Sequence, residues 1–289
     1  MPLTFDVPAV LLVLALGGLY LRAARHRGWP PGRMTAFLAG LGTIVVVTCS
    51  PLAVYDTTFF WVRAVQTTTL LMITPLLLAL GAPIRLLLDT RPATWLRRHG
   101  RGKVARALTF PPVVTLTLVV PVLVLYLTPL YDLTLRSPVA DGLVRLALVL
   151  SGFTYFWTRL GLDPTPRTDP HLVSVWIAFT EVVFDGALGL VLWLGPLLAP
   201  AHYAAAHPGL GPDPRTDQII GAGVLWIGGD VAGLPFVVAL FIRWARDDER
   251  RAKQIDVQLD EEAASGAAST SGLWWENDPE LAERFRERG

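Results

Sequence analysis

FFWVRAVQTTTLLMITPLLLAL, residues 59–80, contains a single ionisable side chain, Arg63. A helix that crosses a bilayer needs about 20 predominantly apolar residues, and it satisfies all of its backbone polar groups internally. This stretch is long enough and apolar enough to meet that requirement. It therefore predicts a transmembrane helix.

Six further stretches have the same character, and the composition agrees with them. Hydrophobic residues make up 52% of the chain and charged residues 17%, whereas a soluble domain has about 25% charged residues. The mean hydropathy is +0.46, and a net charge of +1 gives no reason to expect a nucleic-acid partner. The sequence predicts an all-α, polytopic seven-helix bundle with spans at Val7–Leu21, Met34–Val54, Phe59–Leu80, Pro111–Tyr131, Val139–Leu160, Leu172–Leu198 and Ile219–Trp244.

The connections between these helices sort by charge. Those after the first, third, fifth and seventh helices hold 18 Lys and Arg residues, whereas the opposite side holds only Arg136 and Arg215. Because Lys and Arg stay on the cytoplasmic side, we expect a multi-pass plasma-membrane protein with its N-terminus outside and its C-terminus in the cytoplasm. The expected domains are a transmembrane domain, residues 1–246, and a cytoplasmic polar tail, residues 247–289, with a linker and a short helix.

The ionisable residues inside the predicted spans include Arg63, Arg145, Glu181, Asp185 and Asp230. Such residues are costly in lipid and mark pairing or functional sites. Glu181 and Asp185 share a helix face because they are four positions apart, and both ionise only if a cation is near. We expect Arg63 and Arg145 to balance Asp185 and Asp230. Two interpretations remain open, a structural ion-pair network and a polar pathway for an ion or metal.

Signatures of metal sites and enzymes are sparse. Cys49 is the only cysteine, which excludes an intrachain disulfide. No histidine lies within the predicted membrane core, so ligation of haem by two histidines inside the bundle is not expected. His202 and His207, in a predicted outer loop, leave a loop metal site as an alternative. The sequence has no glycine-rich phosphate loop and no H-E-x-x-H or G-x-S-x-G motif, and we expect a protein that is not an enzyme.

Four segments carry a family resemblance. VQTTTLLMITPLLLALGAPIRLLL (65–88) contains L-G-A-P, and SGFTYFWTRLGLDPTPR (151–167) contains W-x-x-x-G-x-D-P-x-P-R. TDQIIGAGVLWIGGD (216–230) contains D-Q-x-x-G-x-G-x-x-W, and LYLTPLYDLTLRSP (125–138) completes the set. Together they resemble the caa3-type cytochrome c oxidase assembly factor family called CtaG, over residues 35–255. LWWENDPELAERFRER (273–288) resembles the tails of actinobacterial members.

The resemblance implies a seven-helix protein that helps to mature the copper sites of a haem–copper terminal oxidase at the outer membrane face. Typical members carry histidines in the third, fifth and sixth helices, and these imply copper ligands. By alignment, those positions are here Arg63, Thr67, Asp141, Arg145, Ala147 and Asp185. Arginine has no lone pair available for a metal, and copper(I) prefers thiolate, thioether or imidazole. Copper is therefore implied by the family, whereas its usual ligands are absent.

These observations predict a membrane-embedded assembly factor for a haem–copper cytochrome c oxidase, which delivers copper or acts as a scaffold without ligating it. The expected partners are the lipid bilayer, together with oxidase subunits or a copper chaperone. The alternative is a small-solute or ion transporter that uses buried carboxylate–arginine pairs, although no internal repeat supports it. The candidate polar site consists of Arg63, Gln66, Thr67, Arg145, Asp185, Asp217, Gln218 and Asp230, of which Asp217 and Gln218 are expected to anchor the outer end of the seventh helix.

Overall fold

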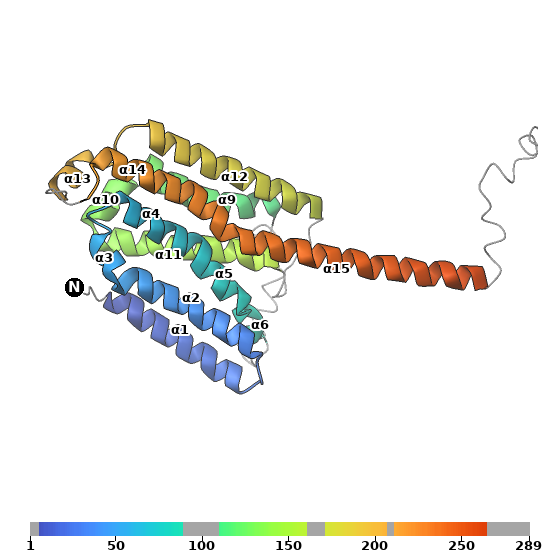
Figure 1. Ribbon diagram of the computed structural model, residues 1–289. Helices are drawn as coiled ribbons and strands as arrows, with labels where there is room; N and C mark the ends of the chain where they lie inside the picture. Colours follow the sequence, from blue (N-terminus) through green and yellow to red (C-terminus); the bar gives the residue numbers. More distant parts are fainter. Residues whose placement is uncertain (1–5, 89–109, 161–170, 207–210, 265–289) are drawn as a thin grey trace, which may run out of the picture. The chain divides into compact units, whose positions relative to one another are not determined.

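The computed structural model describes residues 6–88, 110–160, 171–206 and 211–264. All regular elements in these ranges are helices, which confirms the predicted all-α class (Figure 1). The chain divides into two compact units, Met1–Phe236 and Val237–Gly289. The elements are α1 Val7–Arg25, α2 Pro31–Cys49, α3 Pro51–Tyr55, α4 Phe60–Thr68, η1 Thr69–Ile73, α5 Thr74–Leu80, α6 Pro83–Leu88, α9 Pro111–Leu127, α10 Leu130–Arg136, α11 Pro138–Leu160, α12 His171–Leu194, α13 Pro200–Ala206, α14 Pro214–Gly223, η3 Val224–Gly228 and α15 Gly229–Ala264, where η1 and η3 are π-helical.

Several of these helices are long and apolar enough to cross a membrane. Four described stretches qualify, Val7–Arg25, Pro31–Cys49, Phe60–Leu80 and Pro138–Leu160, and α9 with α10 makes a fifth if this bent pair counts as one span. They coincide with the first, second, third, fifth and fourth predicted helices. The sixth and seventh predicted stretches are helical in α12 and in α14, η3 and α15. A count of seven spans remains a prediction, as does the orientation.

Prolines set two helix ends earlier than the sequence predicted. The second helix ends at Cys49 instead of Val54, because Ser50 turns extended before Pro51 and its hydroxyl caps α3 by accepting a hydrogen bond from the Leu52 N–H at 3.1 Å. The fourth helix does not continue to Tyr131. It ends at Leu127, and the chain bends by 73° into α10. A residue before proline disfavours helical backbone, and Thr128 precedes Pro129.

The third span lies at the centre of the bundle. In Figure 1, α4 and α5 lie among α2, α11 and α14, and these are also their contact partners. Within this span 72% of the residues are buried, against 17–28% in the other three straight spans. Its side chains therefore face protein on most sides, so a polar residue here finds partners on neighbouring helices instead of lipid.

Glycines allow the close approach of helices to this central span. A Cβ added to Gly152 of α11 would clash with the Leu71 carbonyl oxygen of η1 and would lie 2.7 Å from the Pro75 Cγ. A Cβ on Gly221 of α14 would clash with the Phe60 ring of α4. The absence of these side chains brings α11 and α14 against α4, η1 and α5, and that contact assembles the polar site.

The second unit contains the later part of α15. This helix continues to Ala264, and residues 248–261 are exposed. One i, i+4 ion pair supports it, since the Lys253 Nζ lies 2.7 Å from a Glu249 carboxylate oxygen. The predicted short helix of the polar tail lies outside the described residues, as does most of the predicted linker.

Candidate functional site

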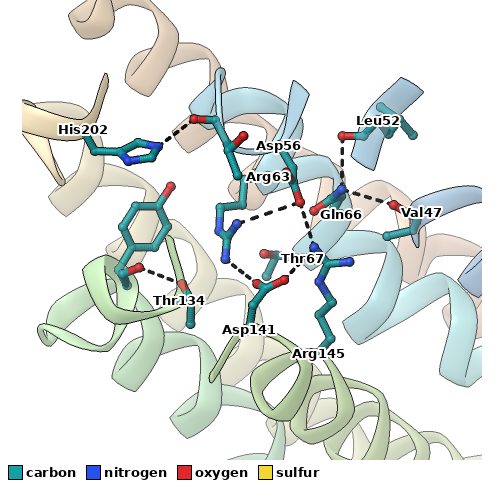
Figure 2. A network of polar contacts seen from close by, with 12 residues as sticks. Val47, Leu52, Asp56, Arg63, Gln66, Thr67, Thr134, Asp141, Arg145 and His202 are labelled. Carbon is teal, nitrogen blue, oxygen red and sulfur yellow. Dashed lines mark hydrogen bonds and ion pairs between the residues drawn. The ribbon is translucent and has the colours of Figure 1, made fainter. Parts of the chain in front are cut away.

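Four charged side chains form a closed ion-pair cluster at the first turn of α4 (Figure 2). Arg63 donates to an oxygen of Asp141 at 2.5 Å, and its second terminal nitrogen lies 4.0 Å from Asp56. Arg145 lies 2.7 Å from Asp56 and 2.7 Å from Asp141. Each arginine therefore contacts both aspartates, and the four formal charges cancel.

Three elements supply this cluster. Arg63 comes from α4, and Asp56 from the turn between α3 and α4. Asp141 and Arg145 are four positions apart on α11, so they share one helix face. The side chains of Arg63 and Asp56 are only 6% and 5% exposed. Burial raises the pKa of the Asp56 carboxyl, while the guanidinium groups of Arg145 and Arg63 act in the opposite direction.

The partners of the two arginines differ from those expected from the sequence. The expected balance of Arg63 and Arg145 by Asp185 and Asp230 is wrong, because both arginines pair with Asp56 and Asp141. Asp56 lies in a turn between two predicted spans, outside the stretches in which a buried charge was expected. A usable signal was present all the same, since an acidic residue in a four-residue turn, 56–59, directly precedes the span that carries Arg63.

Gln66 and Thr67 continue the polar face of α4 inward from the ion-pair cluster. The Gln66 amide nitrogen donates to the carbonyl oxygens of Val47 and Leu52, at 3.2 Å each. These two carbonyls flank the break between α2 and α3, so one side chain satisfies acceptors on either side of it. The Thr67 hydroxyl lies 3.0 Å from the hydroxyl of Tyr126 on α9. Both residues therefore tie α4 to its neighbours.

Asp217 and Gln218 join three helix ends at the start of α14. The Asp217 carboxylate accepts hydrogen bonds from the backbone N–H groups of Phe60, at 2.7 Å, and Trp61, at 3.1 Å. It thus caps α4, whose own N-cap residue makes no side-chain cap bond. The Gln218 amide donates to the carbonyls of Leu192 and Pro196 at the end of α12, at 2.8 and 3.0 Å.

His202 lies near the cluster but contacts backbone. One of its ring nitrogens lies 2.8 Å from the carbonyl oxygen of Thr57, the residue that follows Asp56 (Figure 2). His207, the other loop histidine, lies outside the described residues. Within the described ranges, no group of three or more His, Cys, Asp or Glu side chains is arranged to hold a metal ion.

Asp185 lines a separate cavity farther along α4. The cavity has a volume of about 20 Å³ and is bounded by α4, η1, α9, α12, η3 and α15. Its polar side chains are Thr67, Thr68 and Asp185. Asp230 is the next residue in the chain after Gly229 of the cavity wall. The side chain of Glu181 lies outside the described residues, so the helix face that Glu181 and Asp185 are expected to share stays a prediction.

The eight predicted site residues therefore divide among three places. Arg63 and Arg145 belong to the ion-pair cluster, with Gln66 just below it. Asp217 and Gln218 are helix-end caps. Thr67 and Asp185 meet at the cavity, and Asp230 directly follows Gly229 of its wall in the chain.

Comparison with known proteins decides the family. Residues 15–247 match the cytochrome c oxidase caa3 assembly factor family, which is most of the chain. The chain belongs to the cytochrome c oxidase caa3 assembly factor family. The resemblance expected from the four sequence segments is confirmed. The family assignment gives no support to the transporter alternative.

The curated proteins to which this assembly factor is similar are longer. An uncharacterized protein of Mycobacterium bovis and one of Mycobacterium tuberculosis are each 28% identical over 272 residues, 89% of this chain. An uncharacterized protein of Mycobacterium leprae is 27% identical over 268 residues, 88% of this chain. The chain spans only 41% of the length of each of these relatives. No solved structure matches the assembly factor.

The residues at the positions of the implied histidines do not fit copper(I). At the positions where the family resemblance implies histidines, Arg63 and Arg145 have no free lone pair, and both are tied to Asp56 and Asp141. Thr67 is a hard oxygen donor that is hydrogen-bonded to Tyr126. Copper(I) prefers sulfur and imidazole ligands. The residues at these positions are suited to pairing with one another instead of holding that ion.

Proposed function

We propose that this assembly factor supports the maturation of a haem–copper cytochrome c oxidase as a membrane scaffold, without ligating copper itself. The family match over residues 15–247 carries the oxidase assembly role. The scaffold role rests on the ion-pair cluster, because charges that neutralise one another at buried positions fix the relative placement of α4, α11 and the turn before α4. A fixed outer end gives a partner a defined surface.

The proposed setting is a plasma membrane crossed seven times, with the ion-pair cluster toward the outer face. The distribution of Lys and Arg among the connections supports this orientation. In that setting the cluster and the caps made by Asp217 and Gln218 lie on the side where an oxidase copper site would be loaded. The proposed partners are oxidase subunits or a copper chaperone, and the protein itself is not an enzyme.

Deletion of the gene in the native host tests the assembly role. We expect the oxidase activity of membranes and the copper content of the purified oxidase to fall, and both to recover with the wild-type chain. An Arg136→Ala chain should complement equally well, because Arg136 forms an exposed pair with Asp132 outside the cluster. Normal oxidase activity and copper content in the deletion strain would contradict the proposal.

Copper binding by the purified protein tests the scaffold role separately. Competition with a chromophoric copper(I) chelator should show less than one tightly bound copper ion per chain. A His202→Ala variant should behave as the wild type does, since His202 contacts the backbone carbonyl of Thr57. Tight binding of one copper ion per chain that is lost in His202→Ala would show that the protein is itself a copper carrier.

A further inference from the structure

The cavity beside Asp185 has the size and the lining of a site for one small ion. Its volume of about 20 Å³ exceeds the roughly 10–15 Å³ that a single water-sized occupant needs. The hydroxyl-bearing Thr67 and Thr68 and the carboxyl-bearing Asp185 all line it. A hydroxyl oxygen has two lone pairs, so the Thr67 hydroxyl that bonds Tyr126 at 3.0 Å keeps acceptor capacity.

The charge around this cavity is unbalanced. Asp185 lines the cavity, and Asp230 directly follows Gly229 of its wall in the chain. Arg63 and Arg145, which the sequence predicted as their partners, are held by Asp56 and Asp141 in the ion-pair cluster. No ion pair within the described residues includes Asp185 or Asp230. Asp185 is partly buried, and a carboxylate held away from water without a partner is costly, so a positive charge in the cavity would be stabilised.

The helices around the cavity are shaped to leave this space. A Cβ on Gly229 would lie 3.3 Å from an Asp185 carboxylate oxygen, so glycine leaves that oxygen accessible. Gly189 of α12 lets that helix approach Trp226 of η3, since a Cβ there would lie 2.8 Å from the Trp226 Cβ. Both π-helical segments, η1 and η3, contribute to the cavity wall. Such segments occur frequently at functional sites.

We propose that this cavity binds one small monovalent cation of the sodium type. The Asp185 carboxylate supplies the charge, and the hydroxyls of Thr67 and Thr68 supply neutral oxygen ligands. Oxygen donors favour hard cations, and a single lining carboxylate matches one positive charge. This inference does not depend on the proposed role in oxidase assembly, because the ion would be part of the folded protein itself.

Thermal unfolding of the purified full-length chain in detergent tests the proposal. The melting temperature is measured in sodium, lithium, potassium and choline chloride at equal ionic strength and pH. We expect sodium or lithium to raise it relative to choline in a saturable manner. At a concentration 100 times the dissociation constant, the folding equilibrium shifts about 100-fold. Equal melting temperatures in all four salts would overturn the proposal. The cavity would then hold a water molecule beside a protonated Asp185 carboxyl.

Two variants and a direct binding measurement locate the ion. Asp185→Asn should abolish the sodium effect, and Gly229→Ala should weaken it because the new methyl group crowds the Asp185 oxygen. Asp132→Asn should keep it, since Asp132 belongs to a more exposed pair on α10. Binding of radioactive sodium should saturate at one ion per chain in the wild type. Unchanged binding in Asp185→Asn would overturn the assignment, whether or not that variant is less stable.

Discussion

The carboxylate of Asp217 accepts a hydrogen bond from the backbone N–H of Phe60 at 2.7 Å, although 157 positions separate the two residues in the chain. The first four N–H groups of a helix have no partner within the helix. In α4 two of these groups, on Phe60 and Trp61, find their acceptor on α14. The start of the central span is therefore stabilised by α14, a helix that is synthesised much later than α4.

Replacement of Asp217 by alanine should destabilise the folded bundle. Asp217 is only 1% exposed, so its loss leaves buried N–H groups without an acceptor, at a cost of about 1–3 kcal/mol. The free energy of unfolding in mixed micelles measures this effect. Asp260→Ala removes an exposed carboxylate on α15 and should change little. If the two variants are equally stable, the cap from α14 does not stabilise α4.

Two glycines of α11 should respond in opposite directions to the same substitution. Gly152→Ala adds a methyl group that clashes with the Leu71 carbonyl oxygen, and overpacking of this kind costs about 1–3 kcal/mol. A Cβ added at Gly142 has no neighbouring atom within 4 Å. Replacing a glycine inside a helix by alanine stabilises the fold by about 0.5–1 kcal/mol. The stability changes of both variants are measured by thermal unfolding. A Gly152→Ala variant as stable as Gly142→Ala would contradict the close approach of α11 to η1.

The ion-pair cluster should show strong coupling between its members. Arg145→Met leaves Asp56 and Asp141 facing each other with only Arg63 between them, and breaking a buried pair costs about 3–5 kcal/mol. Adding Asp141→Leu restores equal numbers of charges, so the double variant should recover much of that loss. A double-mutant cycle on the free energy of unfolding measures the coupling.

An exposed pair provides the control for this cycle. Arg136 and Asp132 lie 2.6 Å apart, but their side chains are 71% and 38% exposed. Exposed pairs contribute about 0–1 kcal/mol, so Arg136→Met should be nearly neutral. Additive effects of Arg145→Met and Asp141→Leu would show that the buried contacts do not act together.

The spans could be predicted because length and hydropathy are local properties of the sequence. The third and fifth predicted helices, Phe59–Leu80 and Val139–Leu160, differ from the observed spans by only one residue at their starts. The helix ends at Cys49 and Leu127 were predicted too late, although a proline follows each by two residues. Proline acts through the preceding residue, and an apolar window does not register that constraint.

The pairing of the charges could not be predicted from position along the chain. Arg63 was correctly placed among buried residues, but its partner Asp141 lies on α11, and its other partner, Asp56, lies in a turn. Hydropathy gives the depth of a residue in the membrane and not the direction in which its side chain points. Asp217 and Gln218 were expected to anchor the outer end of one helix, and their hydrogen bonds show that they join α14 to α4 and α12.

Topology reporters should place the connection between α13 and α14 outside the cytoplasm. This side of the predicted seven-span arrangement holds only Arg136 and Arg215, and sparse basic charge is typical of connections that cross the membrane. Alkaline phosphatase inserted after Ala206 should be active in a bacterial host, and a fluorescent protein at the same position should stay dark. The same two reporters joined after Ala264 should give the reverse result. Fluorescence from the reporter after Ala206 would place the ion-pair cluster at the cytoplasmic face. That result would contradict the proposed scaffold role at an outer copper site.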